Sequence, residues 1–170
     1  GIRYGYIEQL DDELLRISKE SFDALSFNCY ALSPDHEKMN HALEISGLPM
    51  IIGEYHFGTV DRGLAQSLWQ VNSQKERGDA FRYYTENAFA HRGLIGTGWF
   101  RWIDQNINGR TDGENYNCGF IDVTDRPYPY MVDAAIETAK SLYEIHSGTK
   151  TPFHQAPNAV GHSPIPDLWE

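Results

Sequence analysis

The sequence predicts an α/β fold in which helices connect the strands of a parallel sheet. Three observations support this prediction. Strand-like and helix-like hydrophobic periodicities alternate along the chain. Glycine or proline residues mark many of the boundaries between these segments. Residues 49–55 form an almost continuous apolar run, which is typical of a parallel strand covered on both faces.

The first half of the chain supplies three strands and two helices. Residues 2–6 form a short strand, and Asp11 or Asp12 caps a helix that extends to residue 20. Residues 24–30 form the second strand. Pro34 starts the next helix and Gly47 ends it, as expected for proline in a first turn and glycine after a last turn. The apolar run 49–55 is the third strand.

The second half continues the alternation. We expect a long helix over residues 66–90 with a break near Gly78, a fourth strand at 94–102, and a polar loop at 104–117. A short strand at 119–123 and a turn at 124–129 follow. The last helix covers 130–147 and ends at Gly148.

Chain length sets the scale of the architecture. The 170 residues suit one domain, and 41% hydrophobic residues are enough for one core. A closed (β/α)8 barrel needs eight strands and about 250 residues, so four main strands amount to half of one. We assign residues 1–148 to this partial barrel and 149–170 to a proline-containing tail without regular structure.

Composition excludes several classes of protein. The net charge is −10, which argues against a nucleic-acid binder. No apolar run approaches the roughly 20 residues that a membrane span needs, and no signal peptide is visible. The two cysteines, Cys29 and Cys118, are too few for a disulfide framework or a structural zinc site. The high aromatic content, 13%, is typical either of an aromatic-rich core or of a cleft that stacks on a flat or ring-shaped ligand.

Polar and aromatic residues gather at the carboxyl ends of three predicted strands, where functional groups of parallel α/β folds meet. These strand ends are 28–30, 53–56 and 99–105. Glu54 ends an apolar run, and burying a carboxylate without partners is costly. We therefore predict that Glu54 is functional.

Five segments, taken in order, resemble the second half of a clan A glycoside hydrolase, a group of retaining enzymes on (β/α)8 barrels. They are PMIIGEYHFG (49–58), DRG (61–63), GWFRWIDQ (98–105), DGENY (112–116) and GFIDVTDRPYP (119–129). The pattern is most similar to the β-agarase family, glycoside hydrolase family 50. The Glu-Tyr-His (54–56) and Trp-x-Asp-Gln (102–105) stretches also resemble the β-galactosidase branch of the clan.

The resemblance implies a role for individual residues. Glu54 matches the nucleophile at the end of strand seven, and Tyr30, at the end of strand six, would hydrogen-bond and orient it. His56 would contact a sugar hydroxyl, and Trp99 or Trp102 would be the platform on which the sugar stacks. Further substrate contacts are expected from Asn28, Asp104, Gln105, Glu114 and Asn115.

The resemblance also implies the activity. We expect cleavage of a β-linked galactan or galactoside, with an oligo- or polysaccharide as partner, no cofactor and no metal ion. Retaining hydrolysis needs a second carboxyl group as acid/base. In this clan that glutamate ends strand four, whereas this chain is expected to begin at strand five, so the piece alone should be almost inactive. By resemblance, the parent enzyme is secreted or periplasmic in a bacterium.

Three other hypotheses remain beside this one. The chain could be a non-catalytic carbohydrate-binding half-barrel that self-associates through its open sheet edges. An unrelated doubly wound α/β protein would need a glycine-rich phosphate loop after the first strand, and residues 5–8 are not such a loop. Asp104, Asn106 and Asn108 imitate a calcium loop, but Asn115 stands where that loop needs glutamate.

Overall fold

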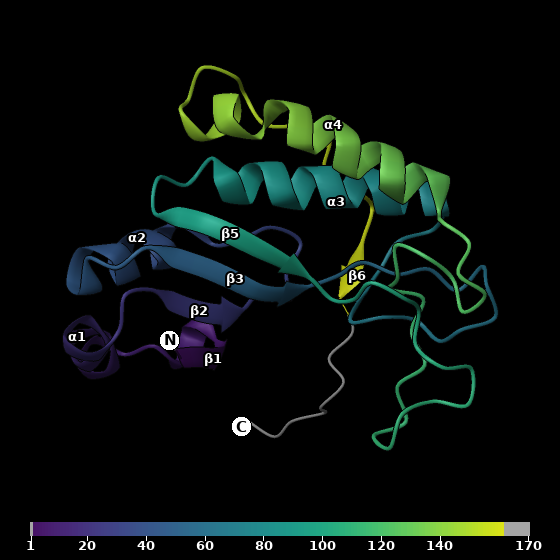
Figure 1. Ribbon diagram of the computed structural model, residues 1–170, viewed down its shortest axis with the longest axis horizontal. Helices are drawn as coiled ribbons and strands as arrows, with labels where there is room; N and C mark the ends of the chain where they lie inside the picture. The colour runs from purple at the N-terminus through teal and green to yellow at the C-terminus, as the bar shows by residue number, and fades with distance from the viewer. Residues whose placement is uncertain (1, 162–170) are drawn as a thin grey trace.

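Four parallel strands form the central sheet of the computed structural model, which describes residues 2–161 (Figure 1). They are β1 (Ile2–Tyr6), β2 (Leu25–Asn28), β3 (Met50–Tyr55) and β5 (Leu94–Trp99). Their order in the sheet, β1-β2-β3-β5, follows the chain. A doubly wound sheet reverses its strand order at a switch point, and the described residues contain no such reversal. The α/β prediction is confirmed, and the doubly wound alternative is not supported.

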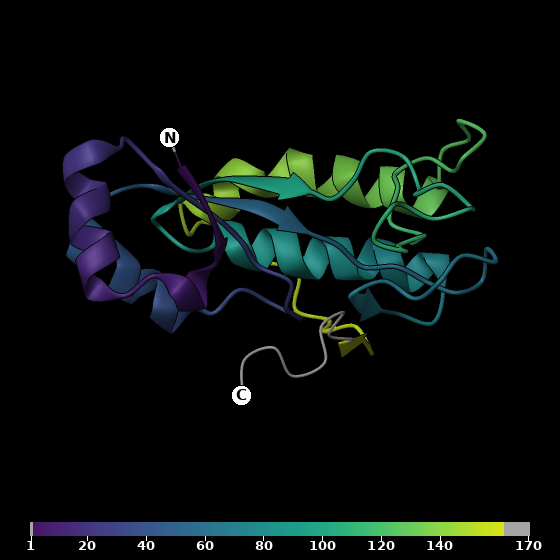
Figure 2. The same cartoon turned by 90° about the horizontal axis from the view of Figure 1, so that it is seen from below.

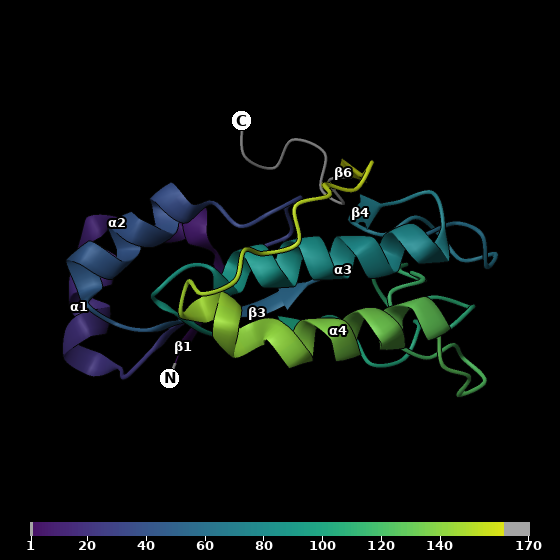
Figure 3. The ribbon, with the colours of Figure 1, turned by 90° about the horizontal axis from the view of Figure 1, so that it is seen from above.

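The helices pack against one another in two pairs. α1 (Asp12–Ser21) and α2 (His36–Ser46) lie side by side near β1 and β2. α3 (Gln74–Phe89) and α4 (Pro129–His146) run side by side along β3 and β5 (Figures 1 and 3). Figure 2 shows the same two pairs from below. No helix among residues 2–161 is both long and apolar enough to cross a bilayer.

The core lies between the sheet and the helices. Alternate residues of the strands, among them Phe27, Met50 and Ile52, are completely buried there, as the period of two in a strand requires. The residues between them face the other side of the sheet and are more exposed, and Ile95 is 57% exposed. The described residues therefore bury one face of the sheet fully and leave the other partly open.

Some predicted boundaries are wrong. The helix predicted at 66–90 begins at Gln74, because the Ser73 side chain caps it by accepting a hydrogen bond from the Glu76 N–H. Part of the stretch before it forms the short strand β4 (Trp69–Gln70). The helix is not broken at Gly78. A Cβ there would lie 2.5 Å from the Tyr130 carbonyl oxygen, so this glycine lets α3 and α4 approach closely.

Two further corrections concern the carboxyl-terminal part. The fourth strand ends at Trp99, and the strand predicted at 119–123 is reduced to isolated bridges at Ile121. The tail was predicted to have no regular structure, but β6 (Val160–Gly161) pairs antiparallel with β4. The Phe153 N–H also donates to Glu86 of α3, at 2.8 Å. The rest of the predicted tail, residues 162–170, lies outside the described residues.

Candidate active site

Glu54 lies at the carboxyl end of β3, and both of its carboxylate oxygens are held. Oε2 accepts hydrogen bonds from the Tyr30 hydroxyl at 2.9 Å and from Asn28 Nδ2 at 3.2 Å. Oε1 forms an ion pair with Arg3 Nη1 at 2.8 Å. The Glu54 side chain is 21% exposed. The carboxylate is therefore fixed in orientation and still reachable from solvent.

A bulge in β3 explains why Glu54 points to the side of the sheet that faces away from the helices. Phe27 pairs with Ile52, but the next residue, Asn28, pairs with Glu54, so β3 contains one extra residue at Gly53. Met50 and Ile52 face the helices, and strict alternation would aim Glu54 the same way. Bulges re-aim side chains next to functional sites. Here the bulge places the carboxylate beside Asn28 and Tyr30.

Tyr30 acts as a donor to Glu54 and stays protonated. Burial raises the pKa of its hydroxyl far above the usual value, and the neighbouring Glu54 carboxylate raises it further. The Tyr30 ring packs edge-on against the His56 ring, with 4.9 Å between the centroids. The predicted pair of Glu54 and Tyr30 is thus brought together, and Asn28 joins it. Within the described residues, the buried Oδ1 of Asn28 has no hydrogen-bond partner.

His56 is only 2% exposed, and both of its ring nitrogens are engaged. Nε2 accepts from the Leu68 N–H at 3.1 Å, so the proton must be on Nδ1, which donates to the Phe100 carbonyl at 3.1 Å. No ring nitrogen is left for a sugar hydroxyl, so the geometry does not support the predicted contact. His56 instead joins the segment at Leu68 to the segment at Phe100, next to the Tyr30 ring.

The neutral state of His56 has a consequence for stability. Burial lowers its pKa from 6.5 to about 3. Between these values the unfolded chain binds a proton that the folded chain does not, so the free energy of unfolding falls as pH drops from 6.5 towards 3. The slope is about 1.4 kcal/mol per pH unit.

We expect the free energy of unfolding of His56→Gln to fall less steeply with decreasing pH than that of the wild type. The difference in slope should correspond to about one proton, in urea unfolding curves measured from pH 4 to 7. The exposed His154 provides the matched control, and His154→Gln should leave the slope unchanged. Equal slopes for wild type and His56→Gln would contradict the neutral, buried assignment.

The two predicted platform tryptophans have different surroundings. Trp99 packs in the core against Tyr55, Phe81 and Phe120, and its Nε1 donates to the Cys118 carbonyl at 2.7 Å. Trp102 is 68% exposed and stacks on Phe120 with 6.0 Å between the centroids. Trp102 is therefore the more exposed of the two rings, whereas Trp99 is partly buried. The Phe100 ring, not singled out from the sequence, lies 5.9 Å from the His56 ring.

Asp104 and Gln105 do not line an open site. Asp104 is 4% exposed, and its oxygens accept hydrogen bonds from Asn117 Nδ2, the Gly119 N–H and the Tyr128 hydroxyl. Gln105 is completely buried, and its Oε1 accepts from the Tyr116 N–H at 2.7 Å. The predicted substrate contacts for these two residues are not supported, because neighbouring protein groups already use their polar atoms.

Glu114 and Asn115 lie in the loop that Gln105 supports. Gln105 Nε2 donates to Glu114 Oε2 at 2.7 Å, and Arg110 Nη1 pairs with the same oxygen at 3.3 Å. The Glu114 side chain is partly exposed. Asn115 accepts from the Ala65 N–H at 3.3 Å, which ties this loop to the one after β3. Both predicted residues of this loop are therefore partly exposed, and Glu114 carries the charged group.

Buried Arg77 of α3 organises the loops around the site, and the sequence alone did not reveal it. Its guanidinium donates to the Phe57 carbonyl at 3.1 Å, the Gly119 carbonyl at 2.5 Å and Asn117 Oδ1 at 3.2 Å. Asn117 in turn donates to Asp104, so the positive charge and the buried carboxylate belong to one network. This network joins the β3–α3 loop to the β5–α4 loop.

No group of three or more His, Cys, Asp or Glu residues in the described chain is arranged to hold a metal ion. The contacts of Asp104 do not support the calcium-loop hypothesis, because its oxygens already accept hydrogen bonds from Asn117, Gly119 and Tyr128.

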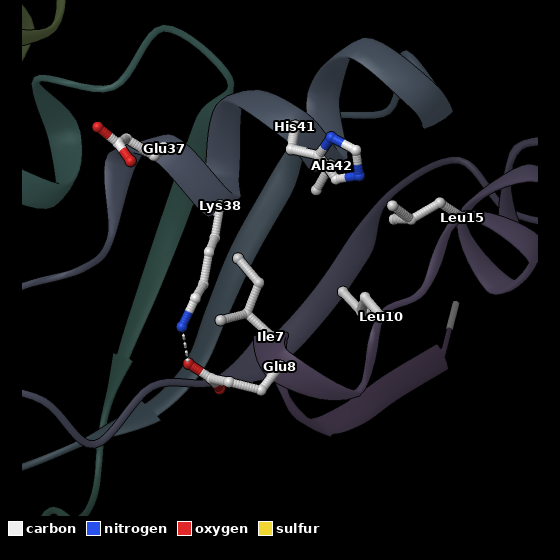
Figure 4. Close-up of a pocket in the computed structure, with 8 residues that line it drawn as sticks. All are labelled: Ile7, Glu8, Leu10, Leu15, Glu37, Lys38, His41 and Ala42. Atoms are coloured by element: carbon white, nitrogen blue, oxygen red, sulfur yellow. Dashed lines mark hydrogen bonds and ion pairs between the residues drawn. The ribbon is translucent and has the colours of Figure 1, made fainter.

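A separate pocket of about 310 Å³ lies between η1 (Ile7–Gln9), α1 and α2 (Figure 4). Ile7, Leu10 and Leu15 form apolar walls, and the ion pair between Lys38 and Glu8 lies at its edge. None of the site residues predicted from the sequence lines this pocket. It is therefore distinct from the Glu54 site.

The fold and the site describe a parallel α/β protein with an oriented carboxylate at the carboxyl end of a central strand. No protein-family model matches the sequence. β-Agarase A of Vibrio sp. (strain JT0107) is 39% identical over 128 residues, which cover 71% of this chain and 13% of the agarase.

Solved structures give the same picture. An exo-β-agarase superposes with a TM-score of 0.76 and 36% identity over 81% of this chain and 19% of that one. The protein PfGH50B superposes with a TM-score of 0.80 and 37% identity, over 86% of this chain and 21% of the PfGH50B chain. The chain is thus similar to β-agarases of glycoside hydrolase family 50, which confirms the resemblance predicted from the sequence. It spans only about an eighth of the length of the curated relative.

Proposed function

We propose that this chain is the part of a retaining, β-agarase-like glycoside hydrolase that carries the nucleophile, Glu54. The observation that carries the proposal is the Glu54 carboxylate, which is partly exposed and held at both oxygens at the carboxyl end of β3. Similarity to β-agarases supports a β-linked galactan such as agarose as the substrate. Because such a polymer is degraded outside the cytoplasm, we place the complete enzyme outside the cell or in the periplasm.

In the proposed reaction, a Glu54 oxygen attacks the anomeric carbon and the bond to the leaving sugar breaks. The leaving oxygen takes a proton from a carboxylic acid, and water later hydrolyses the glycosyl–enzyme ester. The two carboxyl groups of a retaining enzyme lie about 5 Å apart. By resemblance to the clan, the proton donor is proposed to be a glutamate at the end of strand four of the complete barrel.

The proposed architecture is the carboxyl-terminal half, about strands five to eight, of a (β/α)8 barrel. The sequential strand order supports it, because a barrel adds each strand to the same side of the one before. The partly open sheet face at Ile51 and Ile95 supports it as well, since the other half of a barrel would cover that face. Residues 1–148 are proposed as the barrel part, and the described part of the tail, residues 149–161, packs against α3 and β4.

Sugar contacts are proposed for the exposed groups near the strand ends. Trp102 offers an exposed ring, Phe100 borders the His56–Tyr30 pair, and Glu114 offers a partly exposed carboxylate. Sugar C–H faces stack on aromatic rings, and sugar hydroxyls hydrogen-bond to carboxylates. Asn115 is proposed to shape this loop.

The stereochemistry of the products tests the proposed reaction. We expect the complete enzyme to release the β-anomer first from agaro-oligosaccharides, as followed by proton NMR before mutarotation, and to leave starch intact. A first product of α-configuration would show inversion and would exclude a nucleophilic role for Glu54.

The free edges of the sheet favour a second candidate function. Within the described residues, β1 and β5 each pair on one side only. Open edges drive association, so the chain would act as a self-associating, non-catalytic carbohydrate-binding half-barrel. Sugar binding without hydrolysis by the complete protein, together with a stable oligomer in light scattering, would favour this alternative.

A further inference from the structure

We infer that Arg3 is a positioning residue that fixes the orientation of the Glu54 carboxylate, and that residue 53 is glycine because the Arg3 stem fills the space a side chain would take. The inference rests on the proposed function, since it concerns the same carboxylate. It adds two residues, on β1 and β3, that neither the motifs nor the comparisons point to.

The two oxygens of Glu54 are held by different partners. Tyr30 and Asn28 both donate to Oε2, whereas Oε1 is bound by Arg3 alone among the described residues. Without Arg3, the carboxylate keeps contacts at one oxygen only and can rotate about its Cγ–Cδ bond. Arg3 therefore fixes the plane of the carboxylate, and with it the direction in which an oxygen faces the sugar.

The Arg3 ion pair is not a major source of stability. The Arg3 side chain is 54% exposed, and ion pairs in such positions contribute little to folding. Its contribution is expected in the reaction instead, because a displacement of about 1 Å between reacting atoms costs on the order of 100-fold in rate.

Gly53 accommodates the stem of Arg3. A Cβ on Gly53 would lie 2.7 Å from Arg3 Cδ, 3.1 Å from Ser26 Oγ and 3.3 Å from Asn28 Oδ1. The closest of these atoms belongs to a flexible, half-exposed side chain, so a methyl group would displace Arg3 from its place beside Glu54. Gly96 on β5 is a matched comparison, because a Cβ there meets Ile51 Cγ2 at 3.6 Å, an ordinary contact.

The test compares variants of the complete enzyme. Arg3→Ala and Gly53→Ala are each expected to lower kcat on the order of 30- to 100-fold, with KM within about threefold. Arg3→Lys should recover part of the loss, and millimolar guanidinium should partly restore Arg3→Ala but not Gly53→Ala. Gly96→Ala should behave as wild type.

A double-variant cycle links the two residues. Removing the Arg3 stem relieves the clash, so Arg3→Ala/Gly53→Ala should be no slower than Arg3→Ala alone. If the reduction in kcat of the double variant equals the product of the reductions in the two single variants, the proposed relation between Gly53 and Arg3 is overturned. If Gly53→Ala fails to fold, the kcat of Arg3→Ala and its response to guanidinium decide the role of Arg3.

The outcomes separate this inference from the proposed function. Wild-type kcat in Arg3→Ala, or a loss that neither lysine nor guanidinium restores, overturns the positioning role while Glu54 stays essential. Full activity of Glu54→Gln overturns the proposed function itself.

Discussion

Glu54→Gln in the complete enzyme is expected to lower kcat for agaro-oligosaccharides by about 10⁴-fold or more, the scale of losing a nucleophile. Glutamine has nearly the same shape and can still accept a hydrogen bond from Tyr30. Its neutral amide, however, cannot attack the anomeric carbon or form the ester. Binding should persist, with the dissociation constant from calorimetry within about threefold of wild type.

Glu44 supplies the control for this substitution, because it is an exposed carboxylate of α2. Glu44→Gln should leave both turnover and binding at wild-type values. Turnover retained by Glu54→Gln, or loss of binding equal to the loss of turnover, would reject the nucleophilic role.

Arg77→Met is expected to produce the largest loss of stability, about 3–5 kcal/mol in the free energy of unfolding. Methionine fills much of the space but leaves the carbonyls of Phe57 and Gly119 without a donor, and it removes the positive charge that lies near buried Asp104 in the same network. Unpaired buried groups carry their full desolvation cost. Because the network joins two loops at the site, activity should fall with stability.

Urea unfolding of the complete protein measures this effect, provided the domain that contains this chain gives a resolved transition. Arg16→Met is the matched control, since Arg16 is an exposed residue of α1 paired with Asp12. It should change the free energy of unfolding by less than about 1 kcal/mol. Equal effects of the two substitutions would contradict the role given to the Arg77 network.

The order of strands and helices was predictable because local physics dominates it. Buried runs such as β3 are apolar, and side-chain caps such as Ser73 mark helix starts. The start of α3 was misplaced because apolar residues precede the cap without a helical period. β4 and β6 were missed because two-residue strands depend on a pairing between segments about 90 residues apart.

The core of the site was predictable for a geometric reason. Parallel strands place their carboxyl ends at one edge, so Asn28, Tyr30 and Glu54 are expected at the same end of the sheet. Their contact also depends on the adjacency of β2 and β3 and on the bulge at Gly53, which the sequence pattern does not reveal. Arg3 was missed because its ion pair crosses from β1 to β3, and only the strand order and the bulge at Gly53 bring the two side chains together.

The roles of loop residues were less predictable. Asp104, Gln105 and His56 are polar and follow strands, as ligand-binding residues do, yet their partners are backbone groups and buried side chains. Their burial depends on how the β5–α4 loop folds around Arg77 and Asn117. A sequence pattern does not contain that long-range arrangement.

Covalent trapping tests the central claim most directly. The complete enzyme is incubated with an activated 2-deoxy-2-fluoro-β-galactoside, whose glycosyl–enzyme ester hydrolyses slowly, and the labelled peptide is identified by mass spectrometry. We expect one sugar per protein, attached to Glu54 within residues 49–58. A label on any other carboxylate would contradict the central claim.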